Sequence, residues 1–166
     1  MKKMLIAYYS YSGNTAWLAE QLSRAAGAPA ARIETIAPYP ADYDDTVSQA
    51  KREVEQGFVP AIEPIGENAD DFDIVAIGTP VWWYTMAPAV RAFIEAHAWT
   101  GKTVVPFVTD AGWPGTALAD IESACAGAQG VEAFEARFDA AGGGELATPE
   151  RDVRAWTARV AALLED

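Results

Sequence analysis

The chain has little cysteine, histidine and positive charge, and each shortage narrows its possible functions. Its 166 residues include one histidine and one cysteine, Cys125, so an intramolecular disulfide is excluded and nothing indicates an oxidising compartment. Lysine and arginine number 12 against 24 acidic residues, which gives a net charge of −12. Because no basic patch stands out, we expect neither nucleic acid nor an anionic membrane as a partner.

Long hydrophobic runs are also missing. The apolar stretch near the N-terminus covers only residues 4–9, which is too short for the apolar region of a secretion signal. No window approaches the length of a membrane span, and we therefore expect a cytoplasmic protein. Hydrophobic residues still make up 51% of the chain, enough for the core of one domain over residues 1–166.

Short apolar runs alternate with helical patterns along the whole chain. The runs predict strands over 4–9, 31–36, 73–78, 103–108 and 131–138. Five helices follow them, and the second presents a stripe of Val47, Ala50 and Val54. This alternation predicts an α/β fold, a three-layer α/β/α sandwich with a five-stranded parallel sheet. The stretch 141–149 is expected to be a flexible connection.

Several residues mark the ends of these predicted helices, and one proline interrupts a predicted strand. Gly27 and Gly57 are expected to end the first two helices, Pro88 to stand in the first turn of the third, and Thr148 to cap the last. Pro106 conflicts with its strand, because proline removes a backbone donor. Either that strand bulges at Pro106 or its pairing is incomplete there.

Three loops should form a binding site, because doubly wound sheets bind ligands beyond the carboxyl ends of their strands. They are the first loop, SYSGNT (10–15), the second loop, TPVWWYTMAP (79–88), and the third loop, TDAGWPG (109–115). The first loop ends at a helix N-terminus, where unpaired N–H groups favour an anion. It contains neither a lysine nor a GxGxxG pattern, which favours a single phosphate monoester. The alternative is a serine-rich turn that only caps the helix.

Aromatic side chains gather in the other two loops. Trp82, Trp83 and Tyr84 follow one another directly after a predicted buried strand, and Trp113 stands in the third loop. Such side chains offer flat faces to a flat ligand, although packing of helices on the sheet is the alternative. A phosphate at one end and a flat apolar ring at the other describe flavin mononucleotide (FMN).

These motifs in order resemble the flavodoxin family. The resemblance rests on YYSYSGNT, TPVWW and PFVTDAGWPG, together with PYPADYDDTVSQAKRE over 38–53, and it covers nearly the whole chain. It implies the strand order 2-1-3-4-5 and FMN as the cofactor. It implies cofactor contacts from Ser10, Tyr11, Ser12, Gly13, Asn14, Thr15, Thr79, Pro80, Val81, Trp82, Trp83, Tyr84, Thr109, Asp110, Ala111, Gly112 and Trp113. It assigns no catalytic residue and no metal.

The chain departs from the flavodoxin pattern at two places. Many relatives carry a glycine in the second loop, where a peptide flips as the flavin is reduced, and TPVWWYTM has none. Asp110 and Ala111 stand where relatives often have small residues such as Ser-Gly. A carboxylate near the ring would disfavour an anionic reduced flavin and so lower its reduction potential.

Three functions remain open from the sequence. The first is an electron carrier that shuttles low-potential electrons between redox partner proteins, a reductase and an acceptor, and meets them through its acidic surface. The second is an FMN-dependent NAD(P)H oxidoreductase that acts on quinones or similar acceptors. The third is a module that has lost its flavin and serves in protein interaction. Direct oxidation of NAD(P)H by the purified protein separates the first two.

Overall fold

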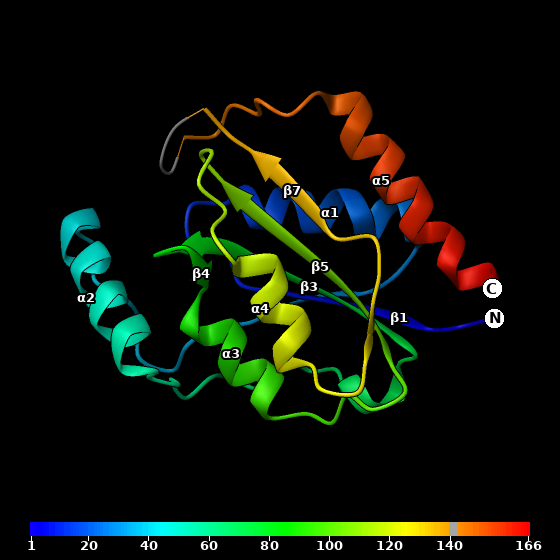
Figure 1. Cartoon of the computed structure of the whole chain (residues 1–166), viewed down its shortest axis with the longest axis horizontal. Helices are drawn as coiled ribbons and strands as arrows, with labels where there is room; N and C mark the ends of the chain where they lie inside the picture. Colours follow the sequence, from blue (N-terminus) through cyan, green and yellow to red (C-terminus); the bar gives the residue numbers. More distant parts are fainter. Residues whose placement is uncertain (140–142) are drawn as a thin grey trace.

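The fold is a parallel sheet covered by helices on both faces (Figure 1). The computed structural model describes residues 1–139 and 143–166. The strands are β1 (Met4–Tyr8), β2 (Ala30–Arg32), β3 (Ile74–Trp82), β4 (Thr85–Met86), β5 (Thr103–Asp110), β6 (Gln129–Gly130) and β7 (Phe134–Arg137). The α-helices are α1 (Asn14–Ala26), α2 (Tyr43–Gln56), α3 (Pro88–Glu95), α4 (Ala117–Ala124) and α5 (Glu150–Ala162). Single 3-10 turns are η1 (Ala69–Asp71) and η2 (Leu163–Glu165).

The strand order runs β2-β1-β3-β5, with β6 and β7 both on the outer edge of β5. These pairs are all parallel, and only the short β4 runs antiparallel, against β3. The predicted order 2-1-3-4-5 is therefore confirmed for the main strands. The predicted count of five was wrong, because β4 is an added hairpin strand and the last strand is split into β6 and β7.

The split of the last strand resolves the conflict at Pro106. β6 pairs with Thr103 and Val104, and β7 begins opposite Phe107, so no described residue pairs with β5 at Pro106 on this edge. The carbonyl of Val104 accepts from Val131 N at 3.0 Å, so its backbone groups face the edge strands. Backbone direction alternates along a strand, so the missing donor of Pro106 faces the same gap. The pairing is incomplete, as one of the two alternatives expected.

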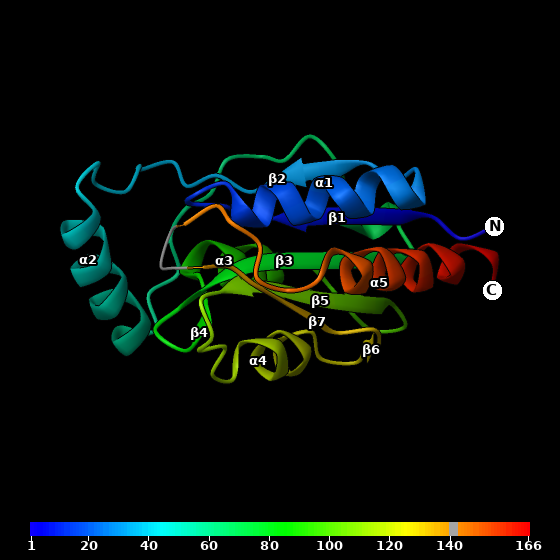
Figure 2. The same cartoon turned by 90° about the horizontal axis from the view of Figure 1, so that it is seen from above.

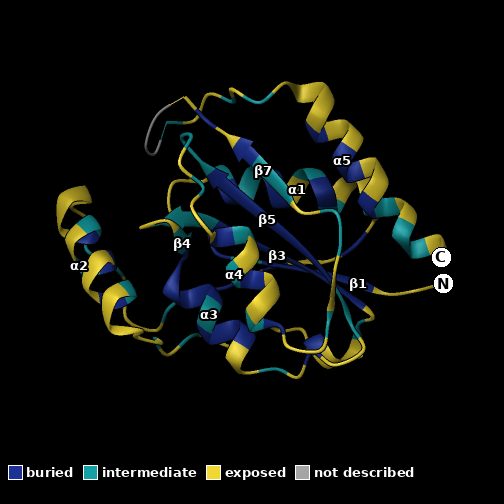
Figure 3. Cartoon of the chain, in the orientation of Figure 1, coloured by how far each residue is buried: buried dark blue, intermediate teal, exposed yellow. Residues whose placement is uncertain are grey.

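Two apolar layers cover the two faces of the sheet. On one face α1 and α5 bury Leu18, Leu22 and Trp156 against β1, β3 and β5. On the other face α3 and α4 bury Phe93 and Ile121. The central strands are buried along nearly their whole length (Figure 3), as expected of strands covered on both sides. The strand at the β2 edge is shorter than the predicted 31–36.

Helix α2 stands apart from both layers (Figure 2), beyond the carboxyl ends of β3 and β5. Asp42 caps it by accepting from Asp45 N at 2.9 Å. Its buried residues are Thr46, Ala50 and Glu53, while Val47 and Val54 of the predicted stripe are half-buried. The stripe assumed packing on the sheet face, whereas α2 packs beyond the sheet edge.

The predicted helix ends hold at three of four positions. Gly27 and Gly57 end their helices in the left-handed conformation, with φ of 63° and 64°, and Pro88 opens α3. Thr148 does not cap α5, because its Oγ1 accepts from Arg137 N at 2.8 Å. That bond ties the segment before α5 to β7 instead.

The one histidine and the one cysteine of the chain have structural roles, beside α3 and α4 respectively. His97 Nδ1 lies 2.8 Å from Phe93 O at the end of α3, and Cys125 is buried beside α4, where burial raises its pKa to about 12. Two residues of the connection expected over 141–149, Ala141 and Gly142, lie outside the described residues. Over residues 1–139 and 143–166, no helix combines the length and the apolar character needed to span a bilayer.

Candidate functional site

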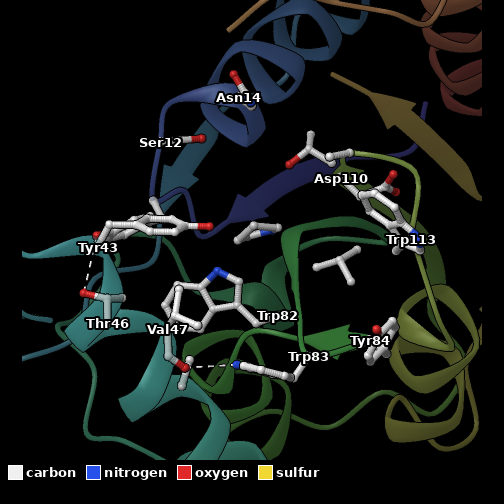
Figure 4. A pocket seen from close by; sticks show the side chains of 16 residues that line it. Ser12, Asn14, Tyr43, Thr46, Val47, Trp82, Trp83, Tyr84, Asp110 and Trp113 are labelled. Carbon is white, nitrogen blue, oxygen red and sulfur yellow. Dashed lines mark hydrogen bonds between the residues drawn. The ribbon is translucent and has the colours of Figure 1, made fainter. Parts of the chain in front are cut away.

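A cavity of about 310 Å³ opens at the carboxyl edge of the sheet (Figure 4). The three loops predicted to form a site meet here. Predicted residues that line the cavity are Tyr11, Ser12, Asn14, Pro80, Val81, Trp82, Trp83, Tyr84, Thr109, Asp110, Ala111 and Trp113. Predicted residues outside its lining are Ser10, Gly13, Thr15, Thr79 and Gly112. Its volume falls within the range of small-molecule sites, roughly 300–1,000 Å³.

The predicted residues that do not line the cavity hold the three loops in place. In the first loop, Ser10 Oγ accepts from Ala16 N at 3.1 Å. The buried hydroxyls of Thr15 and Thr109 lie 2.8 Å apart and join the first loop to the third. The structure therefore gives the side chains of Ser10 and Thr15 a supporting role.

Similar support holds the second and third loops. Thr79 Oγ1 accepts from Ala87 N at 3.0 Å, which joins the end of β3 to the start of α3. Gly112 N donates to Asp110 Oδ1 at 2.6 Å, and the φ of Gly112 is 115°. These hydrogen bonds hold both loops in place beside the cavity.

The first loop ends at the N-terminus of α1, which makes this end of the cavity suitable for an anion. Gly13 has a φ of 102° and open space where a Cβ would stand, and as the N-cap residue it makes no side-chain hydrogen bond to the helix. The N–H groups of Gly13, Asn14 and Thr15 have no hydrogen-bond partner within residues 1–139 and 143–166. Free N–H groups and the helix dipole together favour negative charge.

Trp82 forms the aromatic floor of the cavity. Its ring packs edge-to-face against Tyr39, Tyr9 and Tyr11, with ring centroids 5.0, 5.5 and 5.9 Å apart. Burial raises the phenol pKa of both Tyr9 and Tyr39 above the ordinary range. Trp82 therefore fits both roles that the sequence left open, packing and ligand binding. One side of its ring packs against the tyrosines, and the other side lines the cavity.

Trp83 and Tyr84 form a two-residue turn between β3 and β4. The predicted strand ended at residue 78, but β3 continues to Trp82 and the chain reverses at once. Both turn residues are left-handed, with φ of 50° and 68°. A hairpin turn of this kind normally carries Asn-Gly, so two aromatic residues here are under backbone strain. Strain held at a cavity mouth points to a role for these side chains.

Hydrogen bonds hold this turn on both sides. Trp83 Nε1 donates to Val47 O at 3.0 Å, and Lys51 Nζ lies 5.3 Å from the centroid of the Trp83 ring (Figure 4 shows the hydrogen bond). Tyr84 O accepts from Thr116 N at 2.8 Å. The turn therefore connects α2 on one side to the start of α4 on the other.

Helix α2 supplies a wall that the sequence did not reveal. Its contribution to the cavity lining is Tyr43, Thr46, Val47 and Ala50. Glu53, on the same helix, is buried and accepts from Tyr39 Oη at 2.7 Å and from Gln49 Nε2 at 2.8 Å. Gly57 predicted where α2 ends, but no sequence signal placed the helix beside the cavity.

Removing one hydroxyl should loosen this wall. Tyr39→Phe leaves the buried Glu53 carboxylate without one of its donors, at an expected cost of about 1–3 kcal/mol in the free energy of unfolding. Hydrogen exchange should speed up for the amides of α2 before those of the sheet. Tyr43→Phe is the matched control, because the Tyr43 side chain is exposed and should change stability by less than about 0.5 kcal/mol. Equal effects of the two variants would contradict the assigned anchor.

The fold is that of a doubly wound α/β protein, and its cavity suits an anionic, ring-bearing ligand. The chain belongs to the flavodoxin family, since the family model described as flavodoxin matches residues 3–131. A protein from Bacteroides eggerthii named as a flavoprotein is 31% identical over 98% of this chain and 99% of its own, with a TM-score of 0.77.

Two further solved structures share the fold. A flavoprotein from Lactobacillus acidophilus in complex with FMN is 23% identical over 81% of this chain and 93% of its own, with a TM-score of 0.69. A flavodoxin, WrbA-like protein from Agrobacterium tumefaciens is 17% identical over 99% of this chain and 98% of its own, with a TM-score of 0.65. A search of the curated proteins finds no match.

Proposed function

We propose that this protein binds FMN in the cavity and carries electrons between redox partner proteins. One observation carries the proposal: a single cavity reaches from Ser12 and Asn14, at the start of α1, to Trp82, Trp83 and Trp113. FMN has a phosphate at one end and a flat apolar ring at the other, so the two ends of the cavity match it. The Lactobacillus acidophilus relative in complex with FMN supports the same ligand.

The residues present fit each part of FMN. N–H groups at the start of α1 and the hydroxyl of exposed Ser12 would hold the phosphate. Pro80 and Val81, at the end of β3, would lie along the linking chain, and the tryptophans would cover the ring. Thr109 and Asp110 would border the polar edge of the ring. FMN supplies the redox chemistry, and the protein sets the potential through its surroundings.

An electron carrier agrees best with the chemistry of the cavity wall. Within the described part of the chain, the lining contains no lysine, arginine, histidine or cysteine. The wall therefore offers no cation to hold the phosphates of a second nucleotide and no imidazole or thiol for catalysis. The mouth is open, with Tyr84 and Trp113 59% and 69% exposed. An exposed aromatic mouth on an acidic protein suits contact with basic partner proteins.

The oxidoreductase stays a second candidate because of α2. Its wall extends the cavity beyond the three loops, as a site for a small acceptor beside the ring would require. The FMN-loaded protein should oxidise NADPH very slowly by itself and rapidly when an NADPH-dependent flavoprotein reductase is added. Absorbance of NADPH followed with and without the reductase measures both rates. Equally fast oxidation without the reductase would contradict the carrier and favour the oxidoreductase.

A further inference from the structure

The third loop contains a buried oxygen without a partner. Asp110 Oδ1 accepts from Gly112 N, but Asp110 Oδ2 is buried and has no hydrogen-bond partner in the described residues. A buried carboxylate oxygen left in this state is costly, so native proteins normally provide a donor. A neighbouring carboxyl group that carries a proton can act as such a donor.

Glu135 is in the right place to supply that donor. It stands opposite Val108 in the parallel β5–β7 register, and Arg137 stands opposite Asp110. Because side chains alternate along strands and opposite residues share a face, Val108, Asp110, Glu135 and Arg137 project from the same face of the sheet. Burial raises the pKa of Glu135, and the charge of Asp110 and a hydrogen bond with it raise that pKa further.

The other charges around Glu135 do not cancel this effect. Arg137, on the same strand, lowers the pKa of Glu135, but its Nη2 lies 3.8 Å from Glu135 Oε1 and its side chain is 55% exposed. Helix α4, which packs on β5, carries Asp120 and Glu122. Asp120 is held by Thr85 and Thr116, and Glu122 lies against Gly130. The carboxylate of Asp110 is therefore the dominant charge facing Glu135.

We infer that Glu135 and Asp110 form a proton-sharing carboxyl pair at the cavity wall. The Glu135 carboxyl takes up a proton from solvent. Its O–H group then donates a hydrogen bond to Asp110 Oδ2, which gives the buried oxygen a partner. The proton removes one negative charge from the third loop. Negative charge that enters the cavity strengthens the hold of the pair on its proton, and by linkage the proton strengthens the binding of that charge.

The second half of this inference rests on the proposed function. An FMN that gains negative charge on reduction would cause proton uptake at Glu135, although Glu135 does not line the cavity. Glu135 is thus a positioning residue that acts through Asp110. Its effect is opposite to that of two ionised carboxylates, because the protonated pair relieves part of the repulsion between the third loop and a reduced ring.

Titration of the Glu135 side chain tests the pair directly. Carboxyl-carbon NMR on the flavin-free full chain should place the midpoint of Glu135 above the ordinary glutamate range. Asp110→Asn should move that midpoint down. Glu95→Gln, which removes the same charge from the exposed end of α3, is the control and should leave it in place. A midpoint in the ordinary range, or one that ignores Asp110→Asn, would overturn the pair.

The pH dependence of stability gives a second test, because a variant that is merely misfolded would not show the same dependence. A raised pKa in the folded state stabilises the protein below the ordinary glutamate pKa, and this contribution is lost as pH rises through the raised value. Glu135→Gln mimics the protonated form, so its unfolding midpoint should rise relative to the parent protein as pH increases, with no gain at low pH. A difference that stays constant with pH would contradict the pair.

The FMN-loaded chain tests the linkage. The Glu135 midpoint should move up when bound FMN is reduced, and the reduction potential should depend less on pH in Glu135→Gln. An unmoved midpoint with FMN bound would overturn the linkage. A failure to bind FMN would contradict the proposed function instead, because the titration of the flavin-free chain still decides whether the pair exists.

Discussion

Ser12→Asp should weaken FMN binding by about a hundredfold or more. Ser12 is exposed, lines the cavity and directly precedes Gly13 at the N-terminus of α1, where the phosphate would be held. Two unit charges about 4 Å apart repel by about 4 kcal/mol near a protein surface, and each 1.4 kcal/mol is a tenfold change in affinity. Fluorescence titration of the flavin-free protein with FMN measures the loss.

Two controls separate repulsion from damage to the fold. Ser12→Asn has nearly the same shape as Ser12→Asp without its charge, so it should keep most of the affinity. Riboflavin lacks the phosphate, and Ser12→Asp should bind it as the parent protein does. An acidic residue at a helix N-terminus also stabilises the helix by about 0.3–1 kcal/mol, so the variant should not unfold more easily. Equal losses for FMN and riboflavin would contradict a phosphate site at α1.

Tyr84→Gly should stabilise the flavin-free protein and weaken FMN binding together. A non-glycine residue in the left-handed region costs roughly 1–2 kcal/mol, and Tyr84 has a φ of 68°. Glycine removes this cost, so the melting temperature should rise by about 2–4 °C for each kcal/mol in a chain of this size. The aromatic ring at the cavity mouth is lost at the same time.

Tyr84→Ala is the matched control. It deletes the same ring, but alanine is strained at this φ as tyrosine is, so stability should not rise. The two variants should lose FMN affinity to a similar degree, while their melting temperatures should differ. Calorimetry of both flavin-free variants measures that difference. If the two variants had equal melting temperatures, the turn would not be strained, and its backbone would not indicate a role for these aromatic side chains.

The central sheet and the three loops could be predicted because local patterns determine them. Strands β1, β3 and β5 are apolar over nearly their whole length, which only a doubly covered strand requires. The edges were less predictable. The last strand breaks near Glu132, which has a φ of 51°, and no pattern in VEAFEARF marks that break.

The parts that escaped prediction depend on contacts between distant segments. The sequence of α2 specifies a capped, amphipathic helix, but not which surface its apolar side meets. Its position depends on the bond from Trp83 to Val47 and on the buried Glu53. The left-handed turn at Trp83 was equally hidden, because an aromatic pair predicts no such backbone. Glu135 was missed because its role appears only in the β5–β7 register.

A visible absorption spectrum, recorded after incubation with excess FMN and desalting, shows whether the cavity binds flavin. The protein should retain FMN close to one per chain, with flavin bands shifted from those of free FMN by the surrounding tryptophans. The same treatment with Ser12→Asp should give a nearly colourless protein. A colourless parent protein would contradict the account, because the N-terminus of α1 and the aromatic wall would then not form a flavin site.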